Sequence, residues 1–286
     1  MKHKKTWFDY FNIFFMICLC ISMIYPFIYM GAISLSSDVF VLQGKVHLWP
    51  KGFTTKTYEQ VFADERILRS YWNTIVYVVV GTSISLITTS MGAYALSRKK
   101  MIWKKQLSFF IVFTMLFNGG MIPTYLVVKG LGLLNTMWAM VLPYAISAYN
   151  FFVMRTFFNN IPEELEDAGK VDGLSDWGVF WRIAMPLSKP VLATIGLFYA
   201  VYIWNNFMGA LLYLRDSDLW PLQMILRNIV FQNGFDQDNI TGTDTVALAE
   251  SIKYATILVS TIPILCVYPF IQKYFVKGAM LGSVKG

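Results

Sequence analysis

The sequence predicts an all-α integral membrane protein with six transmembrane helices and a cytoplasmic helical hairpin. Three observations predict this class: 56% of the 286 residues are hydrophobic, only 14% are charged, and the hydrophobic residues gather in long runs. Soluble domains carry about 25% charged residues. A helix needs about 20 mostly apolar residues to cross the roughly 30 Å hydrocarbon core of a bilayer. The composition therefore excludes a disordered chain and argues against an ordinary cytosolic enzyme.

Six windows of the sequence are long and apolar enough to span a bilayer. We expect the spans at residues 13–33, 72–96, 109–128, 137–157, 190–212 and 254–274, within a single domain of residues 1–286. We expect the first window to be a retained span and not a signal peptide, because its apolar run exceeds the usual length of about 7–15 residues. In the second window, Gly81, Ser85, Thr88 and Gly92 form a small-residue stripe, which lets neighbouring helices approach closely. Pro123, after Asn118-Gly119-Gly120, is expected to interrupt the third window.

Lysine and arginine decide which way the spans run. They gather before the first window, between the second and third windows, and after the last one, and cytoplasmic loops carry such an excess. With six spans, all three clusters fall on one side, so both termini are predicted to be cytoplasmic. The segment 215–250 holds six acids and two arginines and is predicted to lie outside.

The cytoplasmic stretch 159–189, between the fourth and fifth windows, contains six acids and three bases. A helix is expected with Pro162 in its first turn and Asn160 as a possible cap. Gly173 is placed to end this helix in a left-handed conformation, and Ser175 is placed to cap a second helix. The first helix would carry Leu165, Ala168, Gly169 and Asp172 on one face, and the second Trp177, Phe180, Trp181 and Ala184. Such a hairpin could lie on the bilayer or dock against another protein, and its small, backbone-exposing face favours docking.

The hairpin resembles a known signature. Asp167-Ala168-Gly169, three residues, Gly173, nine residues and Ile183-Ala184-Met185-Pro186 are similar to the "EAA" loop of ABC-importer permeases. That pattern is E-A-A, three residues, G, nine residues, I-x-L-P, so the departures are Asp167, Gly169 and Met185. The resemblance implies that the loop couples the permease to an ATPase through Glu166, Asp167, Ala168, Gly169, Asp172, Gly173, Ile183 and Pro186.

Other segments resemble carbohydrate-uptake permeases of the maltose-permease-G-like kind. They are residues 118–125 (NGGMIPTY), 131–136 (LGLLNT), 204–206 (WNN) and 272–286. The resemblance implies a type I ABC importer permease fold, in a multi-pass protein of the bacterial cytoplasmic (inner) membrane. It further implies import of an oligosaccharide or other carbohydrate by alternating access. The implied partners are a second homologous permease, two ABC ATPase subunits and an extracytoplasmic solute-binding protein, with no nucleic acid.

No phosphate-binding loop is present in the sequence. Gly169-Lys170 and Gly44-Lys45 lack both the upstream glycine and the following Ser or Thr of the G-x-x-x-x-G-K-[ST] pattern. We therefore expect no enzyme activity and no cofactor on this chain, with ATP and Mg²⁺ on the partner ATPases. The cysteines at 18, 20 and 266 lie in apolar runs without metal-ligand spacing, so no metal site is predicted.

A pathway for sugars needs aromatic faces and amide or hydroxyl groups without trapping charges. The fifth window offers Tyr199, Tyr202 and Asn206 at i, i+3 and i+7, beside Trp204 and Asn205. Further candidates for the same cavity are Asn118, Tyr125, Tyr149 and Asn150. These polar groups could instead bond neighbouring helices to one another, and the sequence leaves both interpretations open.

Two other function classes compete with that of an ABC-importer permease. An ion-coupled secondary transporter is the main alternative, but such proteins place ionisable groups within their spans, and here the acids lie in loops. An intramembrane enzyme is disfavoured, because the spans contain no H-E-x-x-H, no paired aspartates and no Ser/Lys dyad. His3 and His47 are isolated in flanking and loop sequence.

Overall fold

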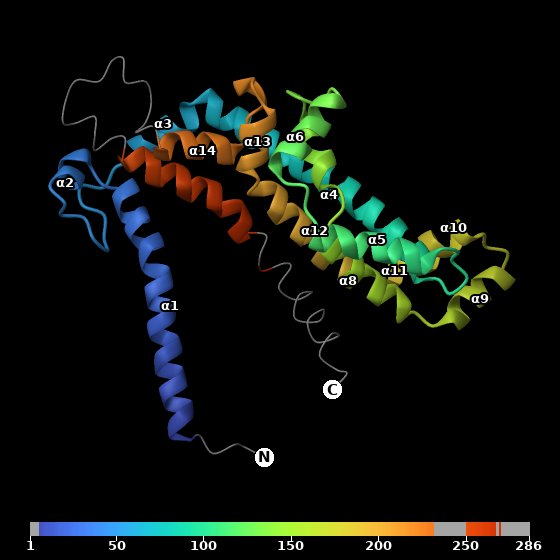
Figure 1. Cartoon of the computed structure of the whole chain (residues 1–286). Helices are drawn as coiled ribbons and strands as arrows, with labels where there is room; N and C mark the ends of the chain where they lie inside the picture. The colour runs from blue at the N-terminus through green and yellow to red at the C-terminus, as the bar shows by residue number, and fades with distance from the viewer. Residues whose placement is uncertain (1–5, 232–249, 267–268, 270–286) are drawn as a thin grey trace. The chain divides into compact units, whose positions relative to one another are not determined.

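The computed structural model describes residues 6–231, 250–266 and 269, and within these residues it contains helices and no strand (Figure 1). The chain divides into two compact units. The first unit comprises residues 1–68 and 225–263, and the second comprises residues 69–224 and 264–286.

The first unit contains α1 (Trp7–Ser34), α2 (Asp38–Leu42), α3 (Lys56–Ala63) and helical residues 250–263. Its small core joins the end of α1 to α2 and to the loop after α2 through Ala32, Ile33, Val41 and Val46. The ring of Tyr254 meets that of Tyr29 edge-on, with ring centroids 6.1 Å apart. The unit therefore ties residues 250–263 to the C-terminal end of α1.

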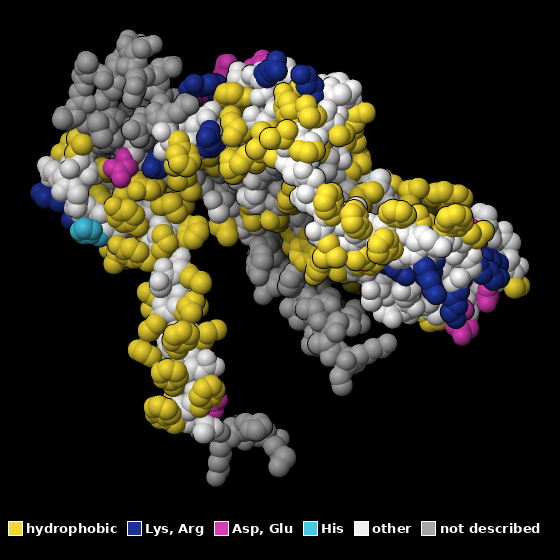
Figure 2. All heavy atoms as spheres, in the orientation of Figure 1, with side chains coloured by type: hydrophobic (Ala, Val, Ile, Leu, Met, Phe, Trp, Pro, Cys, Tyr) yellow, Lys and Arg dark blue, Asp and Glu magenta, His cyan; other side chains and the backbone are white. Residues whose placement is uncertain are grey.

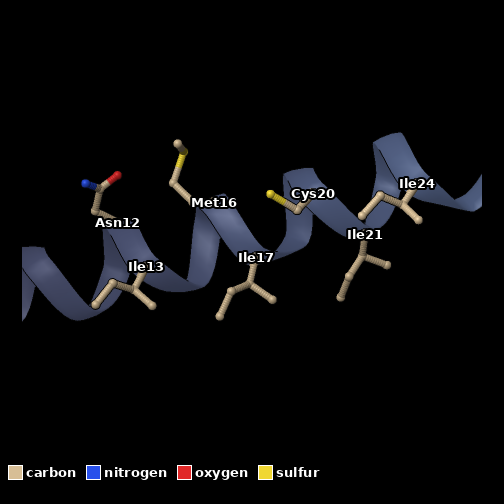
Figure 3. A pocket seen from close by; sticks show the side chains of 7 residues that line it. All are labelled: Asn12, Ile13, Met16, Ile17, Cys20, Ile21 and Ile24. Atoms are coloured by element: carbon tan, nitrogen blue, oxygen red, sulfur yellow. The ribbon is translucent and has the colours of Figure 1, made fainter. Parts of the chain in front are cut away.

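Most of α1 exposes apolar side chains, up to its buried C-terminal end (Figure 2). One side of the helix forms a shallow hollow of about 350 Å³ (Figure 3), lined by Asn12, Ile13, Met16, Ile17, Cys20, Ile21 and Ile24. A helix that is apolar all round is typical of a membrane span. Pro26 lies inside it, which membrane helices tolerate better than soluble ones.

The second unit carries most of the helices. They are α4 (Glu65–Ser97), which begins in the first unit, α5 (Lys104–Leu116), α6 (Met121–Gly130), α7 (Met137–Val141), α8 (Ala148–Asn159), α9 (Glu163–Val171), α10 (Asp176–Val179), α11 (Met185–Leu187), α12 (Lys189–Trp204) and α13 (Phe207–Tyr213), with 3₁₀ turns at Leu142–Tyr144 and Ser217–Leu219. A π-helical segment, Phe180–Ala184, joins α10 to α11, and α14 (Leu222–Phe231) continues into the first unit.

Two glycines let helices pack closely on α4. A Cβ on Gly81 would lie 2.7 Å from Cδ1 of Ile203 in α12, and a Cβ on Gly92 would lie 2.9 Å from Cε2 of Phe151 in α8. Real Cβ atoms do not approach so closely, so glycine permits the contact. The small-residue stripe of the second window therefore brings α8 and α12 against α4.

The windows at 13–33 and 72–96 fall inside α1 and α4, the two described helices that are each long and apolar enough to span a bilayer. The third window is broken, since α5 and α6 are bent by 119°. The expectation that Pro123 makes this break is wrong. The break comes at Gly120, whose φ is +90° and whose N–H donates to Oδ1 of Asn118. Pro123 lies in the first turn of α6, where proline removes no intrahelical bond.

The fourth and fifth windows are also not single helices. The segment Met137–Tyr144 meets α8 at a bend of 53°. In the fifth window, α12 ends at Trp204, Asn205 follows as its C-cap, and Asn206 caps the start of α13. A continuous helix over 190–212 is therefore a wrong prediction.

The sixth window begins within the helical residues 250–266, and its end, from 267 to 274, lies outside the described residues apart from 269. With bent pairs counted as single spans, up to five described segments could cross a bilayer. In its described residues the protein is thus mostly helical, with several membrane-spanning segments, and the count of six stays a prediction.

Candidate functional site

The hairpin within 159–189 turns at Gly173, whose φ is +83°. The N–H of Leu174 donates to the carbonyl of Gly169 at 2.9 Å, and the N–H of Gly173 donates to that of Lys170 at 3.0 Å. This is the pattern of a helix closed by a left-handed residue. Oγ of Ser175 then accepts from the N–H of Gly178 at 3.2 Å and caps α10. The expected roles of Gly173 and Ser175 in local structure are confirmed.

The start of the hairpin differs from the prediction. Pro162 is the N-cap of α9, with an extended ψ of 134°, and the helix begins at Glu163. Asn160 is not its cap, because it closes α8, donating its N–H to the carbonyl of Phe157 at 3.0 Å. The reason is that α8 runs to Asn159, so the two helices share only a short connection.

One side of the hairpin packs on the rest of the second unit. Phe180 and Ala184 belong to a buried core cluster that includes Phe158 of α8 and Ile195 of α12. Gly169 lies so close to the second arm that a Cβ there would be 2.5 Å from Cδ1 of Ile183. The hairpin is therefore held against α8 and α12.

Ion pairs fix α9 to the end of α4. Arg98 pairs with Glu166, which is only 8% exposed. The same guanidinium donates to the carbonyl of Phe158 at 2.9 Å and lies 4.6 Å from the ring centre of Tyr94. At the surface, Nζ of Lys99 lies 3.0 Å from a carboxylate oxygen of Glu163. We call the Arg98–Glu166 pair the clamp.

A third ion pair joins the two arms of the hairpin, with 2.9 Å between Nζ of Lys170 and Oδ1 of Asp176. The hydrogen bond from Lys170 lowers the pKa of Asp176 below its usual 3.8, and the same bond raises the pKa of Lys170 above 10.5. The pair is therefore charged throughout the range between these two pKa values, and it is lost only as the pH falls through the lowered pKa of Asp176 or rises through that of Lys170.

The eight predicted coupling residues divide between the two sides of the hairpin. Glu166 and Gly169 are buried against the rest of the unit, and Ile183 is half-buried beside Gly169. The outward face, as we name it, carries the exposed members Asp167, Ala168, Asp172, Gly173 and Pro186. Lysine, arginine and acidic side chains gather at this end of the second unit (Figure 2).

Each expected face of the hairpin thus contains both buried and exposed residues. Gly169 turns inward while Leu165, Ala168 and Asp172 are exposed, and Phe180 and Ala184 turn inward while Trp177 and Trp181 are exposed. Sequence reasoning missed Arg98 and Lys99 as partners of the hairpin and took them only as markers of orientation. The signal was a basic run that could pair with the acidic run of α9.

The predicted pathway residues of the fifth window do not share one surface, because α12 ends before Asn206. Tyr199 is 3% exposed, and its hydroxyl bonds Oγ1 of Thr89 at 2.7 Å and accepts from the N–H of Ser147 at 3.0 Å. It holds α12 to α4 and to the start of α8. Tyr202, by contrast, is 51% exposed, with its ring centre 5.4 Å from that of Tyr144.

The break between α12 and α13 concentrates polar groups. Oδ1 of Asn206 accepts from the N–H of Gly209 at 2.9 Å, and Nδ2 of Asn205 donates to the carbonyl of Val201 at 2.9 Å. Nδ2 of Asn206 and Nε1 of Trp204 are buried and have no hydrogen-bond partner among the described residues. Buried donors without acceptors are costly, so a polar ligand with acceptor groups would be favourable at this break.

The other predicted pathway residues are scattered. Tyr125 stacks on Tyr213, with ring centres 6.4 Å apart. Asn118 and Tyr149 are exposed, and Asn150 is 5% exposed. Sequence reasoning missed Tyr144 and Tyr213, whose rings meet the predicted tyrosines.

It also missed Asn135, whose φ is +58°. Oδ1 of Asn135 accepts from the N–H groups of Arg215 and Asp216 at 3.0 and 2.9 Å. The segment 131–136, one of those that carried the resemblance, is therefore anchored to the loop after α13.

Known proteins similar to this chain agree with the geometry. A family described as "Binding-protein-dependent transport system inner membrane component" matches residues 66–280. The chain is 45% identical to the polygalacturonan/rhamnogalacturonan transport system permease protein YtcP of Bacillus subtilis (strain 168), over 99% of this chain and 100% of that protein. It is 47% identical to Protein LplC of the same organism, over 98% of this chain and 95% of that protein.

A solved structure is similar as well. It is the crystal structure of a bacterial ABC transporter involved in the import of the acidic polysaccharide alginate. One of its chains superposes with a TM-score of 0.87 at 36% identity, covering 94% of this chain and 96% of that chain.

These matches confirm the resemblance to ABC-importer permeases. They reject the alternative of an ion-coupled secondary transporter, because the matched family is described as a component of binding-protein-dependent transport systems. They also agree with a chain that is not itself an ATPase. The chain therefore belongs to the binding-protein-dependent transport system inner membrane components, the membrane permease subunits of ATP-binding-cassette importers, in which separate subunits hydrolyse ATP.

Proposed function

We propose that this chain imports an oligosaccharide together with a second homologous permease, two ATPase subunits and an extracytoplasmic solute-binding protein. The observation that carries the proposal is the full-length similarity to a polygalacturonan/rhamnogalacturonan permease, supported by the likeness to an alginate importer. The chain itself would bind no nucleotide or metal, and ATP and Mg²⁺ would bind to the ATPase partners.

The proposed topology has six spans, with both termini and the hairpin in the cytoplasm. Its support is the run of basic residues between α4 and α5. This run contacts α9, because Arg98 pairs with Glu166 in the clamp. Positive charge of this density is typical of cytoplasmic loops.

We assign the outward face of the hairpin to contact with an ATPase subunit. Its exposed Asp167, Ala168 and Asp172 offer small and acidic groups, flanked by the exposed ring of Trp177. Because the opposite side is held by the clamp and by Phe180, a push on the hairpin would move α4, α8 and α12 together. Such rigid-body switching between two packed states is how alternating access is achieved.

The substrate pathway is proposed to pass the break between α12 and α13. The support is a pair of buried donors, Nε1 of Trp204 and Nδ2 of Asn206, which have no partner in the described part of the chain, together with the exposed ring of Tyr202. Sugar hydroxyls would supply the missing acceptors, and an aromatic face suits the apolar side of a sugar ring.

Binding by the cognate solute-binding protein tests the substrate class. Calorimetry should detect binding of oligogalacturonide, alginate or neutral oligosaccharide fragments, and uptake into proteoliposomes should follow the same order of preference. Binding of amino acids or peptides, with no carbohydrate bound, would reject the proposal.

Gly173→Val tests the coupling role. Nothing lies within 4 Å of a Cβ at Gly173, so the variant is strained only by its left-handed backbone, by about 1–2 kcal/mol. Transport and substrate-stimulated ATP hydrolysis should fall together while the permease still inserts. Gly173→Asn is the matched control, since asparagine tolerates this conformation, and it should keep most activity. Normal coupling in Gly173→Val would contradict the assignment.

A further inference from the structure

A cavity of about 540 Å³ opens between α5 and α8, and none of its lining residues belongs to the hairpin's outward face or to the proposed pathway. Its lining is Lys104, Lys105, Ser108, Phe109, Val112, Phe152 and Arg155. Three cations thus meet three large apolar side chains in one hollow. Neither the family match nor the coupling role assigns a purpose to it.

The cations of this cavity have no acidic partner in the described part of the chain. The ion pairs found there engage Arg66, Arg69, Arg98, Lys99 and Lys170, but not the three cavity cations. Arg155 donates from Nη1 to Oγ of Ser108 at 3.0 Å, while its buried Nε has no partner among the described residues. Within the described residues, no carboxylate therefore balances the positive charge of these three side chains.

Lys104 shows the same excess of charge. Its ammonium donates to the carbonyls of Ser97 and Arg98, at 3.1 and 3.3 Å, at the end of α4. Desolvation, followed by repulsion from Arg155, Arg98 and Lys99, lowers the pKa of Lys104 below 10.5. An anion bound in the cavity would relieve this repulsion.

The start of α5 adds to the attraction for an anion. Its N-cap, Trp103, has a φ of +63° and makes no side-chain hydrogen bond to the first turn. The first N–H groups of α5 are thus left without a side-chain cap, and they carry the positive end of the helix dipole. Lys104 and Lys105 lie in this same turn.

The apolar wall decides which anion fits. From Lys104 to Val112 the cavity follows α5 for about 12 Å, at about 1.5 Å per residue. No residue of α5 is buried by the described chain, which leaves this face free to contact lipid. Cations at a span's cytoplasmic end suit a lipid phosphate, and Phe109, Val112 and Phe152 would lie beside its acyl chains. A soluble phosphate would leave that wall unused.

We propose that this cavity binds an anionic phospholipid, with its phosphate held by Lys105, Arg155 and the start of α5. The proposal depends on the topology above only for the leaflet, which would be the cytoplasmic one. It does not depend on which sugar is imported.

The test uses the assembled transporter in nanodiscs of equal parts phosphatidylcholine and phosphatidylglycerol. Native mass spectrometry after gentle delipidation should find phosphatidylglycerol retained by the wild type. Lys105→Gln and Arg155→Gln should each weaken retention about fivefold, and Arg155→Lys should keep most of it. Lys100→Gln is the matched control, because Lys100 is exposed on the same connection and does not line the cavity.

The same experiment separates the possible occupants. Glycerol 3-phosphate should not displace the retained lipid, and displacement at equal concentration would show a site for soluble anions. Equal retention by wild type and by the Lys105→Gln/Arg155→Gln double variant would also overturn the proposal. A double variant that loses an ATPase subunit but retains as much lipid as the wild type would overturn the proposal too, because the cavity would then be a contact with another protein.

Discussion

Single residues in this permease carry two roles, one in local structure and one in function, and substitutions must separate the two. Gly169 stands where the related loops have alanine. A Cβ at this position would lie 2.5 Å from Cδ1 of Ile183. The departure from the E-A-A pattern therefore follows from packing between the arms of the hairpin.

Gly169→Ala tests this explanation. Alanine favours the helix over glycine by about 1 kcal/mol, but here it meets the terminal methyl of Ile183. In an Ile183→Val background that methyl is absent, so the same substitution should be more favourable by about 1 kcal/mol. Thermal unfolding of the four proteins of the cycle in detergent measures the difference. Equal effects of Gly169→Ala in the two backgrounds would show that the contact is unimportant.

Asn206 caps α13 through Oδ1, and its Nδ2 has no hydrogen-bond partner among the described residues. Asn206→Ala removes both features and costs about 1 kcal/mol of cap stability, whereas Asn206→Ser keeps a capping oxygen and removes only the amide. If the amide contacts sugar, both variants should transport poorly while basal ATP hydrolysis is kept. Normal transport by Asn206→Ser would assign the residue to capping alone, as measured by uptake in proteoliposomes.

At the scale of elements, the hairpin is joined to the end of α4 by a part-buried ion pair and by an exposed one. The side chains of Arg98 and Glu166 are 21% and 10% exposed, whereas those of Lys99 and Glu163 are 80% and 55% exposed. Exposed pairs contribute little, because water and salt screen them. The clamp is therefore expected to hold α9 in place.

Glu166→Gln is the variant that loosens the clamp. It leaves the Arg98 guanidinium without its carboxylate and should cost about 2 kcal/mol. We expect a lower melting temperature and weaker coupling of ATP hydrolysis to transport. Glu163→Gln, the matched control on the exposed pair, should cost less than about 1 kcal/mol. Indistinguishable melting and coupling in the two variants would contradict the role of the clamp.

At the scale of the whole molecule, the orientation in the membrane determines whether the hairpin can reach an ATPase. Lys100 and Ser217 are exposed residues of the second unit, and they are predicted to lie on opposite sides of the membrane. In a variant with Cys18, Cys20 and Cys266 replaced by alanine, Lys100→Cys should label only from the cytoplasm and Ser217→Cys only from outside. Labelling of both from one side would overturn the topology and, with it, the leaflet assigned to the lipid.

The sequence by itself determined the class of this protein and the local structure of its hairpin. Long apolar windows predict α1 and α4, because the length of a span depends only on bilayer thickness. Gly173 and Ser175 could be placed because a left-handed turn and a helix cap are decided by a residue and its immediate neighbours. The spacing around them also pointed to the permease family, which the comparisons confirm.

Only the tertiary structure decided which side of each element is buried and where the spans break. Arg98 meets Glu166, and Tyr199 meets Thr89, across long stretches of chain, and no local pattern specifies such partners. Hydropathy averaged over the fifth window concealed the break at Asn206, since a cap depends on one side chain and not on mean composition. The side of α9 that is buried depends on two contacts with other segments. Gly169 packs against Ile183, and Glu166 pairs with Arg98.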